Sequence, residues 1–147
     1  MSNFMEQALI EAKLAGERGE VPVGAVLVKD KAIIAKAGNR TLELKDPTAH
    51  AEILVLREAG KLLNSERLIG CDLYVTLEPC PMCAAAISFA RIRRLYFGAQ
   101  DTKSGGVENG VHFFSNASCH HAPEVYSGFS AQEASDLLKS FFKEKRS

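Results

Sequence analysis

The sequence predicts an α/β fold in which helices pack on a mixed β-sheet. Segments rich in β-branched residues alternate along the chain with segments of helical periodicity. Such alternation is typical of a layered α/β architecture. The first two strands are separated only by a short charged turn, so we expect an antiparallel hairpin within the sheet. The chain has 147 residues, of which 46% are hydrophobic, and fits one domain spanning residues 1–147.

The N-terminal part is predicted to form a helix followed by that hairpin. Residues 3–18 place apolar side chains at helical spacing, and Asn3 with Glu6 three positions later forms the pattern of a capping box. Residues 23–28 and 32–37 are the predicted strands of the hairpin.

A polar loop is predicted to follow the hairpin as far as Thr48. Thr48 comes directly after a proline and is predicted to cap a helix over residues 49–63, with Ile53, Leu56 and Leu63 directed to the core. The remaining predicted elements are, in order, a strand over 72–76, a helix over 81–90, a strand over 94–98, a short helix near 111–115, a strand over 125–128 and an amphipathic helix that starts with a capping box at Ser130 and Glu133.

The composition argues against a membrane protein and against a globally basic nucleic-acid-binding protein. Lys and Arg number 18, as do Asp and Glu, so the formal net charge is zero. No apolar run approaches the ~20 residues of a membrane helix, and the first residues lack the features of a signal peptide. We therefore expect a cytoplasmic protein whose four cysteines are not paired in disulfides.

Two local basic stretches remain open to either of two interpretations. They are residues 91–94 and the C-terminal Lys139, Lys143, Lys145 and Arg146. Each is either a solvated face or a contact to phosphates, and an RNA substrate would favour phosphate contact for residues 91–94. In that case binding should weaken steeply with salt despite the zero net charge.

Two short motifs supply the parts of a hydrolytic zinc site. The first, His-Ala-Glu, begins at His50 and ends at Glu52, and the second, Pro-Cys-Pro-Met-Cys, contains Cys80 and Cys83. A catalytic zinc takes three nitrogen or sulfur ligands and leaves a fourth position for water, so His50, Cys80 and Cys83 can be the three ligands. Glu52 is then free to carry protons between that water and a substrate, as hydrolytic deamination requires.

The spacing within each motif indicates where the helices must start. Cys80 and Cys83 lie three apart and share one face of a helix, whose N-terminus favours the thiolate form. His50 and Glu52 lie two apart, which in a regular helix directs them ~200° away from each other. Both can face one metal only if His50 lies in an irregular first turn, so two helix N-termini are expected to converge on the ion.

Other interpretations of these residues exist. The cysteines could form a redox pair beside a buried histidine, or a closed structural zinc could recruit a fourth ligand, in which case Glu52 would have no role. The candidates for that ligand are Cys71, Cys119, His120 and His121, and the last three could also form a second metal site or only part of a partly buried loop.

The two motifs resemble those of the zinc-dependent nucleoside and nucleic-acid deaminases. The similarity extends over nearly the whole chain and is greatest to the bacterial tRNA-specific adenosine deaminases of the TadA type. The segments that carry it are Glu20–Val26, Gly38–Arg40, Ala49–Ile53, Leu73–Cys80, Arg94–Lys103 and Leu137–Phe142. After Lys103 the chain departs from the pattern of that family.

This resemblance implies a role for each matching residue. His50, Cys80 and Cys83 would bind one zinc ion per subunit, and Glu52 would be the general acid and base. Asn39, which from its own sequence context could be only a turn residue, would hydrogen-bond the flipped-out base. The other implied substrate contacts are Val21, Pro22 and Ala51 along the base pocket with Pro79 nearby, and Asp101, Lys103 and Phe142 at the flanking nucleotides of the anticodon loop.

The resemblance also implies a fold, a reaction and an assembly. The fold would be a three-layer α/β/α arrangement with a five-stranded mixed sheet, the reaction RNA editing of the wobble adenosine of a tRNA anticodon to inosine, and the assembly a homodimer. Two alternatives remain: a deaminase of a free base or nucleoside such as guanine or cytidine, and an RNA-binding zinc module without catalysis.

Overall fold

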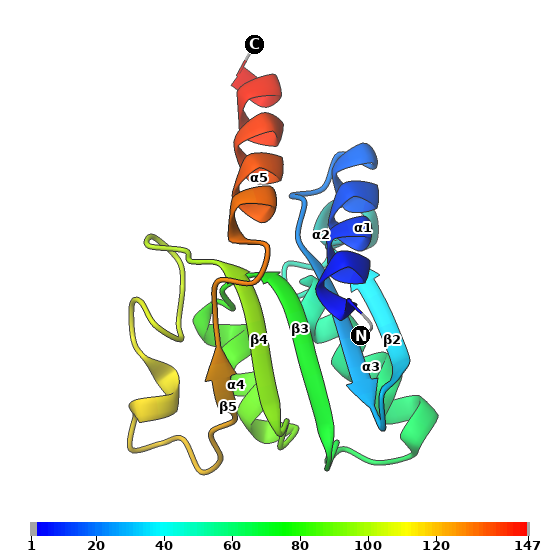
Figure 1. Ribbon diagram of the computed structural model, residues 1–147, viewed down its shortest axis with the longest axis vertical. Coiled ribbons are helices and arrows are strands. Elements are labelled where there is room, and N and C mark those ends of the chain that lie inside the picture. Colours follow the sequence, from blue (N-terminus) through cyan, green and yellow to red (C-terminus); the bar gives the residue numbers. More distant parts are fainter. Residues whose placement is uncertain (1–2, 147) are drawn as a thin grey trace.

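A computed structural model describes residues 3–146 as a five-stranded sheet with helices on both faces (Figure 1). Residues 1, 2 and 147, which belong to the predicted domain, lie outside the described residues. The elements are α1 (Phe4–Glu17), β1 (Gly24–Lys29), β2 (Ala32–Gly38), α2 (Thr41–Leu44), α3 (Ala51–Leu63), β3 (Cys71–Leu77), α4 (Pro81–Phe89), β4 (Arg94–Ala99), the 3₁₀ turn η1 (Phe113–Ser115), β5 (Glu124–Tyr126) and α5 (Ala131–Arg146).

The sheet is mixed, as the hairpin predicted. Its strand order is β2-β1-β3-β4-β5, with β1 antiparallel to both β2 and β3, and with β3, β4 and β5 parallel to one another. Because β3 and β4 run in the same direction, the segments that follow them emerge at the same edge of the sheet. This edge carries the start of α4 and the loop after Ala99.

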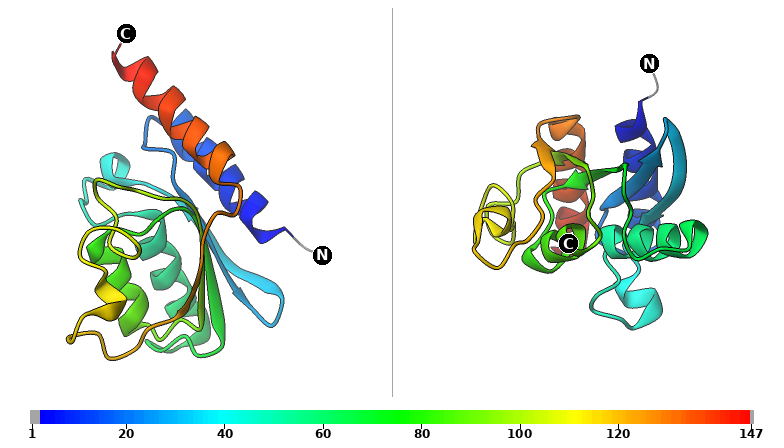
Figure 2. Two further views of the ribbon diagram at one scale, coloured as in Figure 1. Left: turned by 60° about the vertical axis from the view of Figure 1, so that its left-hand side comes forward. Right: turned by 90° about the horizontal axis from the view of Figure 1, so that it is seen from below.

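Alternation of side chains along β1 separates the two helical layers. Ala25 and Leu27 face the main core, which α3 and α4 cover, whereas Val26 and Val28 face the other side and pack with Met5 of α1. Figure 2 (left) accordingly shows α1 and α5 together on one face and α3 and α4 on the other. This is the three-layer α/β/α fold expected from the resemblance.

The predicted core side of α3 is confirmed in part. Ala51, Val55 and Ala59, spaced four apart, are fully buried, because residues at that spacing share the face turned toward the sheet. Leu56 and Leu63 are partly buried and pack against this core as predicted, whereas Ile53 is partly buried and lines, together with Leu56, a groove between α3 and α4.

The segment after β2 also differs from the prediction. Residues 41–44 form the short helix α2 instead of a continuous loop, and its backbone N–H groups at Leu42 and Glu43 donate to the carboxylate of Glu20, at 3.2 and 2.9 Å. The N-cap of α3 is His50 and not Thr48, whose N–H and hydroxyl instead donate to Asp46 Oδ1 at 2.8 and 2.6 Å. Glu20 lies too far from α2 in the sequence for a local pattern to reveal that it caps this helix.

The C-terminal elements begin earlier or later than predicted. β5 covers Glu124–Tyr126 and not 125–128, because the chain turns at Gly128 with φ 90°. Ser130 has φ 55°, which is not the extended backbone of a helix N-cap, so the predicted capping box is absent and α5 starts at Ala131. At the other end of the chain the cap is confirmed: the Glu6 N–H donates to Asn3 Oδ1 at 3.1 Å.

Within residues 3–146, no helix combines the length and apolar character needed to cross a membrane.

Candidate metal centre and active site

The start of α3 brings His50 and Glu52 to the same side. His50 is the N-cap residue and has extended backbone angles (φ −73°, ψ 152°), so the helical rotation between residues two apart does not apply to this pair. Glu52 lies in the first turn and is only 4% exposed. The irregular first turn that the sequence required is therefore present.

The start of α4 supplies the two sulfur atoms. Cys80 is the N-cap residue, Pro81 occupies the first helical position, and Cys83 follows one turn later with no exposure to solvent. His50 Nδ1 lies 3.7 Å from Cys80 Sγ and 3.5 Å from Cys83 Sγ, and all three atoms lie within 4.8 Å of one another. As predicted, two helix N-termini meet at one point.

These separations fit a tetrahedral zinc ion. Ligands at ~2.3 Å (sulfur) and ~2.05 Å (nitrogen) from a tetrahedral centre stand about 3.6 Å apart, which matches the two sulfur–nitrogen distances. The donor set of one imidazole and two thiols is also one that zinc prefers. Among residues 3–146, these three form the cluster able to hold a metal, and none of the alternative fourth ligands joins it.

The electrostatics of the cluster favour metal binding. Hydrogen bonding with the Cys83 thiol, and then with His50, lowers the pKa of Cys80 to about 4. The pKa of Cys83 moves strongly upward, because its thiol shares a proton with Cys80 and is buried. One thiolate therefore exists at neutral pH, and a bound cation would displace the proton from the second.

Glu52 has the properties of a proton carrier. Burial raises the pKa of its carboxyl group to about 7, while the nearby His50 and a hydrogen bond with Cys83 act in the opposite direction. A carboxyl group that is neither fully protonated nor fully ionised at neutral pH can act as both acid and base.

Asn39 lies between β2 and the site. Its Oδ1 accepts a hydrogen bond from the Ala51 N–H at 2.8 Å, so it ties the end of β2 to the first turn of α3. Within residues 3–146 no partner is found for its Nδ2 group, which remains available as a donor. Asn39 is thus both the turn residue of one interpretation and a donor suited to the other.

Two of the predicted lining residues lie next to candidate ligands in the sequence, whereas Val21 and Pro22 belong to the segment that precedes β1. Ala51 and Pro79 adjoin ligands and are buried, as is Pro22, whereas Val21 is half-buried. Pro22 also borders a groove between α1 and α5.

The residues predicted to contact flanking nucleotides lie on two segments. Asp101 and Lys103 follow β4, and Asp101 Oδ1 accepts the N–H groups of Lys103 and Ser104 at 3.1 and 2.9 Å, so Asp101 shapes its own turn. Lys103 is exposed. On α5, Phe142 is 44% exposed while its neighbour Phe141 is partly buried, as expected for adjacent helix positions.

Sequence reasoning assigned no role to two buried carboxylates beside the site. Glu20 caps α2, and Glu78 lies two residues before Cys80 and accepts hydrogen bonds from the loop after β4. Each is 2% exposed. Their position inside the family-like motifs was the available signal, but their partners lie more than twenty residues away.

The basic stretch 91–94 does not lie near the site. It precedes β4, whose other end pairs with the Glu78 backbone through Ala99, so about five strand residues, ~16 Å, separate the two. Arg93 pairs with Asp72 at 2.8 Å and Arg94 with Glu124 at 3.3 Å. Contact of residues 91–94 with RNA phosphates therefore stays a prediction, and two of these arginines already pair with carboxylates.

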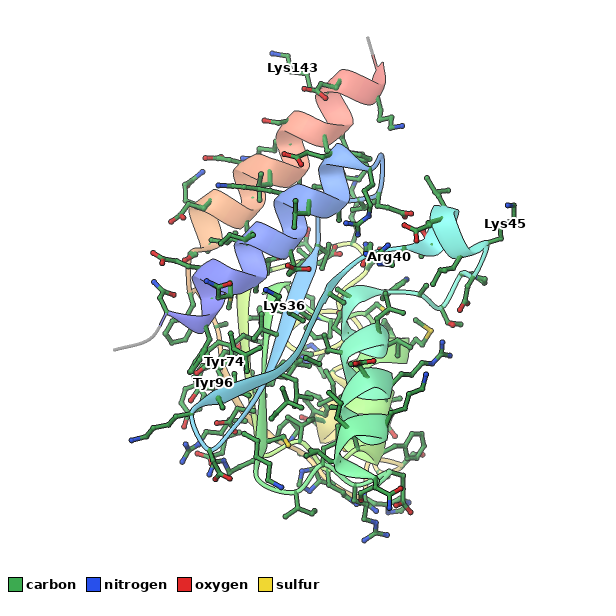
Figure 3. The ribbon with its side chains drawn as sticks, turned by 90° about the vertical axis from the view of Figure 1, so that its right-hand side faces the viewer. Lys36, Arg40, Lys45, Tyr74, Tyr96 and Lys143 are labelled. Atoms are coloured by element: carbon green, nitrogen blue, oxygen red, sulfur yellow. The ribbon has the colours of Figure 1, made fainter. Side chains whose placement is uncertain are left out.

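Arg40 and Lys45 lie on the segment that leads to His50, and the Arg40 N–H donates to the Ala49 carbonyl at 3.0 Å. Figure 3 shows Arg40 and Lys45 beside α2, at the N-terminal end of α3, and Lys143 near the C-terminal end of α5. Sequence reasoning did not select Arg40 or Lys45, because neither belongs to a basic run.

The loop around Cys119 is a structural feature. Ser88 Oγ donates to the His121 carbonyl at 2.6 Å, and His121 Nε2 lies 2.8 Å from the carbonyl of Ile92. These contacts fasten the loop to α4 and to the start of β4, in agreement with the simpler interpretation.

Comparisons with known proteins point the same way. A family model for the cytidine and deoxycytidylate deaminase zinc-binding region matches residues 1–99. A tRNA-specific adenosine deaminase of Agrobacterium fabrum is 66% identical over 145 residues, covering 99% of this chain and 95% of the relative. A solved structure from work on A-to-I editing by tRNA:A34 deaminases at the wobble position of transfer RNA has a TM-score of 0.91 and 67% identity, covering 92% of this chain and 98% of that one.

A more distant similarity concerns a different substrate. The solved structure of guanine deaminase from Bacillus subtilis has a TM-score of 0.68 and 31% identity, covering 99% of this chain and 94% of that one.

Proposed function

This chain belongs to the cytidine and deoxycytidylate deaminase family, and within it to the tRNA-specific adenosine deaminases, and from that premise we propose that it converts the wobble adenosine of a tRNA anticodon to inosine. The observation that carries the proposal is the buried carboxyl group of Glu52 beside the His50, Cys80 and Cys83 cluster. Residues 1–147 would form a single zinc-dependent deaminase domain, a hydrolase that releases ammonia.

The side chains divide the work as follows. His50, Cys80 and Cys83 would hold one zinc ion per subunit, which when bound would supply Lewis-acid activation of a water molecule. Glu52 accepts a proton from the attacking water and delivers it to the ring nitrogen as the C6–O bond forms. Glu52 then moves the remaining proton of the new C6 hydroxyl to the amino group, the C6–N bond breaks, and ammonia leaves.

Burial of Glu52 keeps this proton transfer within the site. Because only 4% of the Glu52 surface is exposed, bulk water cannot replace Glu52 as the proton carrier. We assign the Nδ2 group of Asn39 to a hydrogen bond with the flipped-out base, and Val21, Pro22, Ala51 and Pro79 to its apolar walls. Asp101, Lys103 and Phe142 are assigned to the flanking nucleotides of the anticodon loop.

The test compares an RNA with small substrates. A stem-loop with adenosine at the wobble position should yield inosine, whereas free adenosine and cytidine should yield no product. Equal turnover of free adenosine and the stem-loop would contradict the requirement for RNA.

The similarity to guanine deaminase supports a second candidate, deamination of a free base. Guanine belongs in the same assay for that reason. Conversion of guanine to xanthine, with no inosine from the stem-loop, would favour this second function over the first.

We also propose a homodimer, formed through the outer surfaces of α3 and α4. Phe89 and Leu62 are 72% and 59% exposed there, next to the groove that Ile53 and Leu56 line, and exposed apolar clusters of this kind mark interfaces. In sedimentation experiments the protein should behave as a dimer and Phe89→Ser as a monomer. Ile10→Ser, which alters an exposed residue of α1 on the other face, should remain dimeric.

A substrate of this kind places the protein in the cytoplasm, where tRNA is found. Fractionation of cells that express the tagged chain would test this, and recovery with the membranes would contradict it.

A further inference from the structure

Glu78 is a buried carboxylate whose hydrogen bonds all go to one distant segment. Its Oε1 accepts from the Asp101 N–H at 3.0 Å and from Asn109 Nδ2 at 2.6 Å. Its Oε2 accepts from the N–H groups of Val107, Glu108 and Asn109 at 3.1, 2.9 and 2.9 Å. Every donor belongs to residues 101–109, and three consecutive N–H groups converge on one oxygen, as in an anion-binding nest.

Such an arrangement needs a carboxylate at this position. Glu78 is 2% exposed, and a charge removed from water is unfavourable unless hydrogen bonds replace the lost hydration. A glutamine has one acceptor oxygen, and its NH₂ group would meet N–H donors where the second oxygen stands. An apolar side chain would leave four backbone N–H groups without this acceptor, and Asn109 Nδ2 with only Gln100 Oε1 at 3.5 Å.

The same segment touches the start of α4. The Gly106 N–H donates to the Pro79 carbonyl at 2.8 Å. A Cβ atom at Gly105 would lie 2.5 Å from Glu78 Oε2, and one at Gly106 would lie 2.7 Å from the Pro81 nitrogen. The approach is therefore too close for any residue with a side chain, and Figure 2 shows the segment after β4 running beside α4.

Glu78 thus stands between two parts of the proposed site. Two residues after Glu78, Cys80 begins the helix that carries both sulfur atoms. The N–H of Glu78 itself donates to the Ala99 carbonyl at 2.8 Å. The segment bound by its side chain carries Asp101 and the exposed Lys103. Together with the backbone bonds at Pro79 and Ala99, this side chain therefore holds the metal cluster and the residues assigned to flanking nucleotides at a fixed distance.

We propose that Glu78 is a positioning residue, which holds residues 101–109 in register with the Cys80 helix start so that the anticodon loop and the reacting adenosine are engaged together. The inference rests on the proposed function, because it assumes that residues 101–109 meet RNA. Glu78 itself touches neither the substrate nor the metal cluster in this assignment.

The first test is Glu78→Gln, compared with Glu124→Gln, the same change at an exposed glutamate of β5 that pairs with Arg94 at the far end of β4. Zinc content, kcat and KM for the wobble-adenosine stem-loop are measured on folded protein. We expect one zinc per chain in both variants and a KM about ten-fold higher in Glu78→Gln only, because several hydrogen bonds to a charged group are lost. A KM equal to that of the unaltered protein would overturn the proposal.

A double-mutant cycle separates positioning from general stability. If Glu78 acts through Lys103, the effects of Glu78→Gln and Lys103→Ala on KM should be less than multiplicative, because either change removes the same contact. Independent, multiplicative effects would show that Glu78 does not position Lys103 and would also overturn the proposal.

Asn109→Ala gives a milder perturbation if Glu78→Gln does not fold. It removes the single Nδ2 donor, 2.6 Å from Oε1, and leaves the carboxylate in place. We expect a KM increase of about three-fold, again less than multiplicative with Lys103→Ala, and an unchanged KM would count against the proposal. The unaltered protein is the reference for the underlying activity: if it forms no inosine, the proposed function fails, whereas inosine formation with unaffected variants refutes only the role of Glu78.

Discussion

Replacing Glu52 by glutamine tests the proposed chemistry most directly. The side chain is 4% exposed and hydrogen-bonds with Cys83, so the isosteric amide should fit without repacking. The amide cannot accept or release a proton, and the Glu52 position is buried from bulk water. Loss of general acid–base catalysis lowers turnover by about 10²–10⁴, which is about 2.7–5.4 kcal/mol in activation free energy.

The assay measures single-turnover inosine formation on the stem-loop, together with zinc content and RNA affinity. Because Glu52 is not one of the three ligands, Glu52→Gln should retain one zinc per chain and bind the stem-loop as before. Glu58→Gln, an exposed change on the same helix, should behave as the unaltered protein. The reasoning is refuted if Glu52→Gln turns over normally, or if it loses zinc.

Three further predictions concern the metal, pH and salt. Cys83→Ser should lose zinc and lower the unfolding temperature, and a chelator should do the same to the unaltered protein. A metal at 100 times its Kd adds about 2.7 kcal/mol to the free energy of unfolding. Calorimetry with metal analysis checks this, and equal stability without zinc would contradict it. Burial alone would raise the pKa of Glu20, but the N–H groups of Glu43 and Leu42 hold the pKa below its usual value. The contribution of Glu20 to stability is therefore complete above about pH 4.5 and is lost as the pH falls through the lower folded-state pKa. In acid titrations, Glu20→Gln should lose less unfolding free energy than the unaltered protein, and identical pH profiles would disprove the role. Lys103→Ala should reduce the slope of log affinity against log salt by about 0.7–0.9, as expected for one lost phosphate contact, and an unchanged slope in filter binding would exclude that contact.

Local patterns predicted most of the secondary structure, because they depend on neighbours along the chain. The Asn3 side chain caps α1 through the N–H of Glu6, three residues away, and Pro81 occupies the first position of α4, where no N–H donor is needed. Both helices start where expected. The errors occur where a distant group replaces a local one. Thr48 is an acceptable N-cap by type, but Asp46 binds its hydroxyl, and the Ala51 N–H finds Asn39 Oδ1 instead.

The metal cluster was predictable because its requirements are mostly local. Spacing of three places the cysteines on one helix face, and spacing of two between His50 and Glu52 demands an irregular first turn, which the structure contains. The basic stretch at residues 91–94 shows the opposite case. Its composition suited a nucleic acid, but strand direction places it at the far end of β4, where two of its arginines pair with carboxylates.

The sequence by itself determined the chemistry of this protein: which atoms can hold zinc, which carboxyl group can move a proton, and which helices must start beside them. Only the tertiary structure decided how the surrounding segments are held. Glu20 and Glu78 each bind backbone N–H groups more than twenty residues away. Buried carboxylates accept whichever donors the fold brings to them, and a pattern of neighbouring residues cannot reveal those donors.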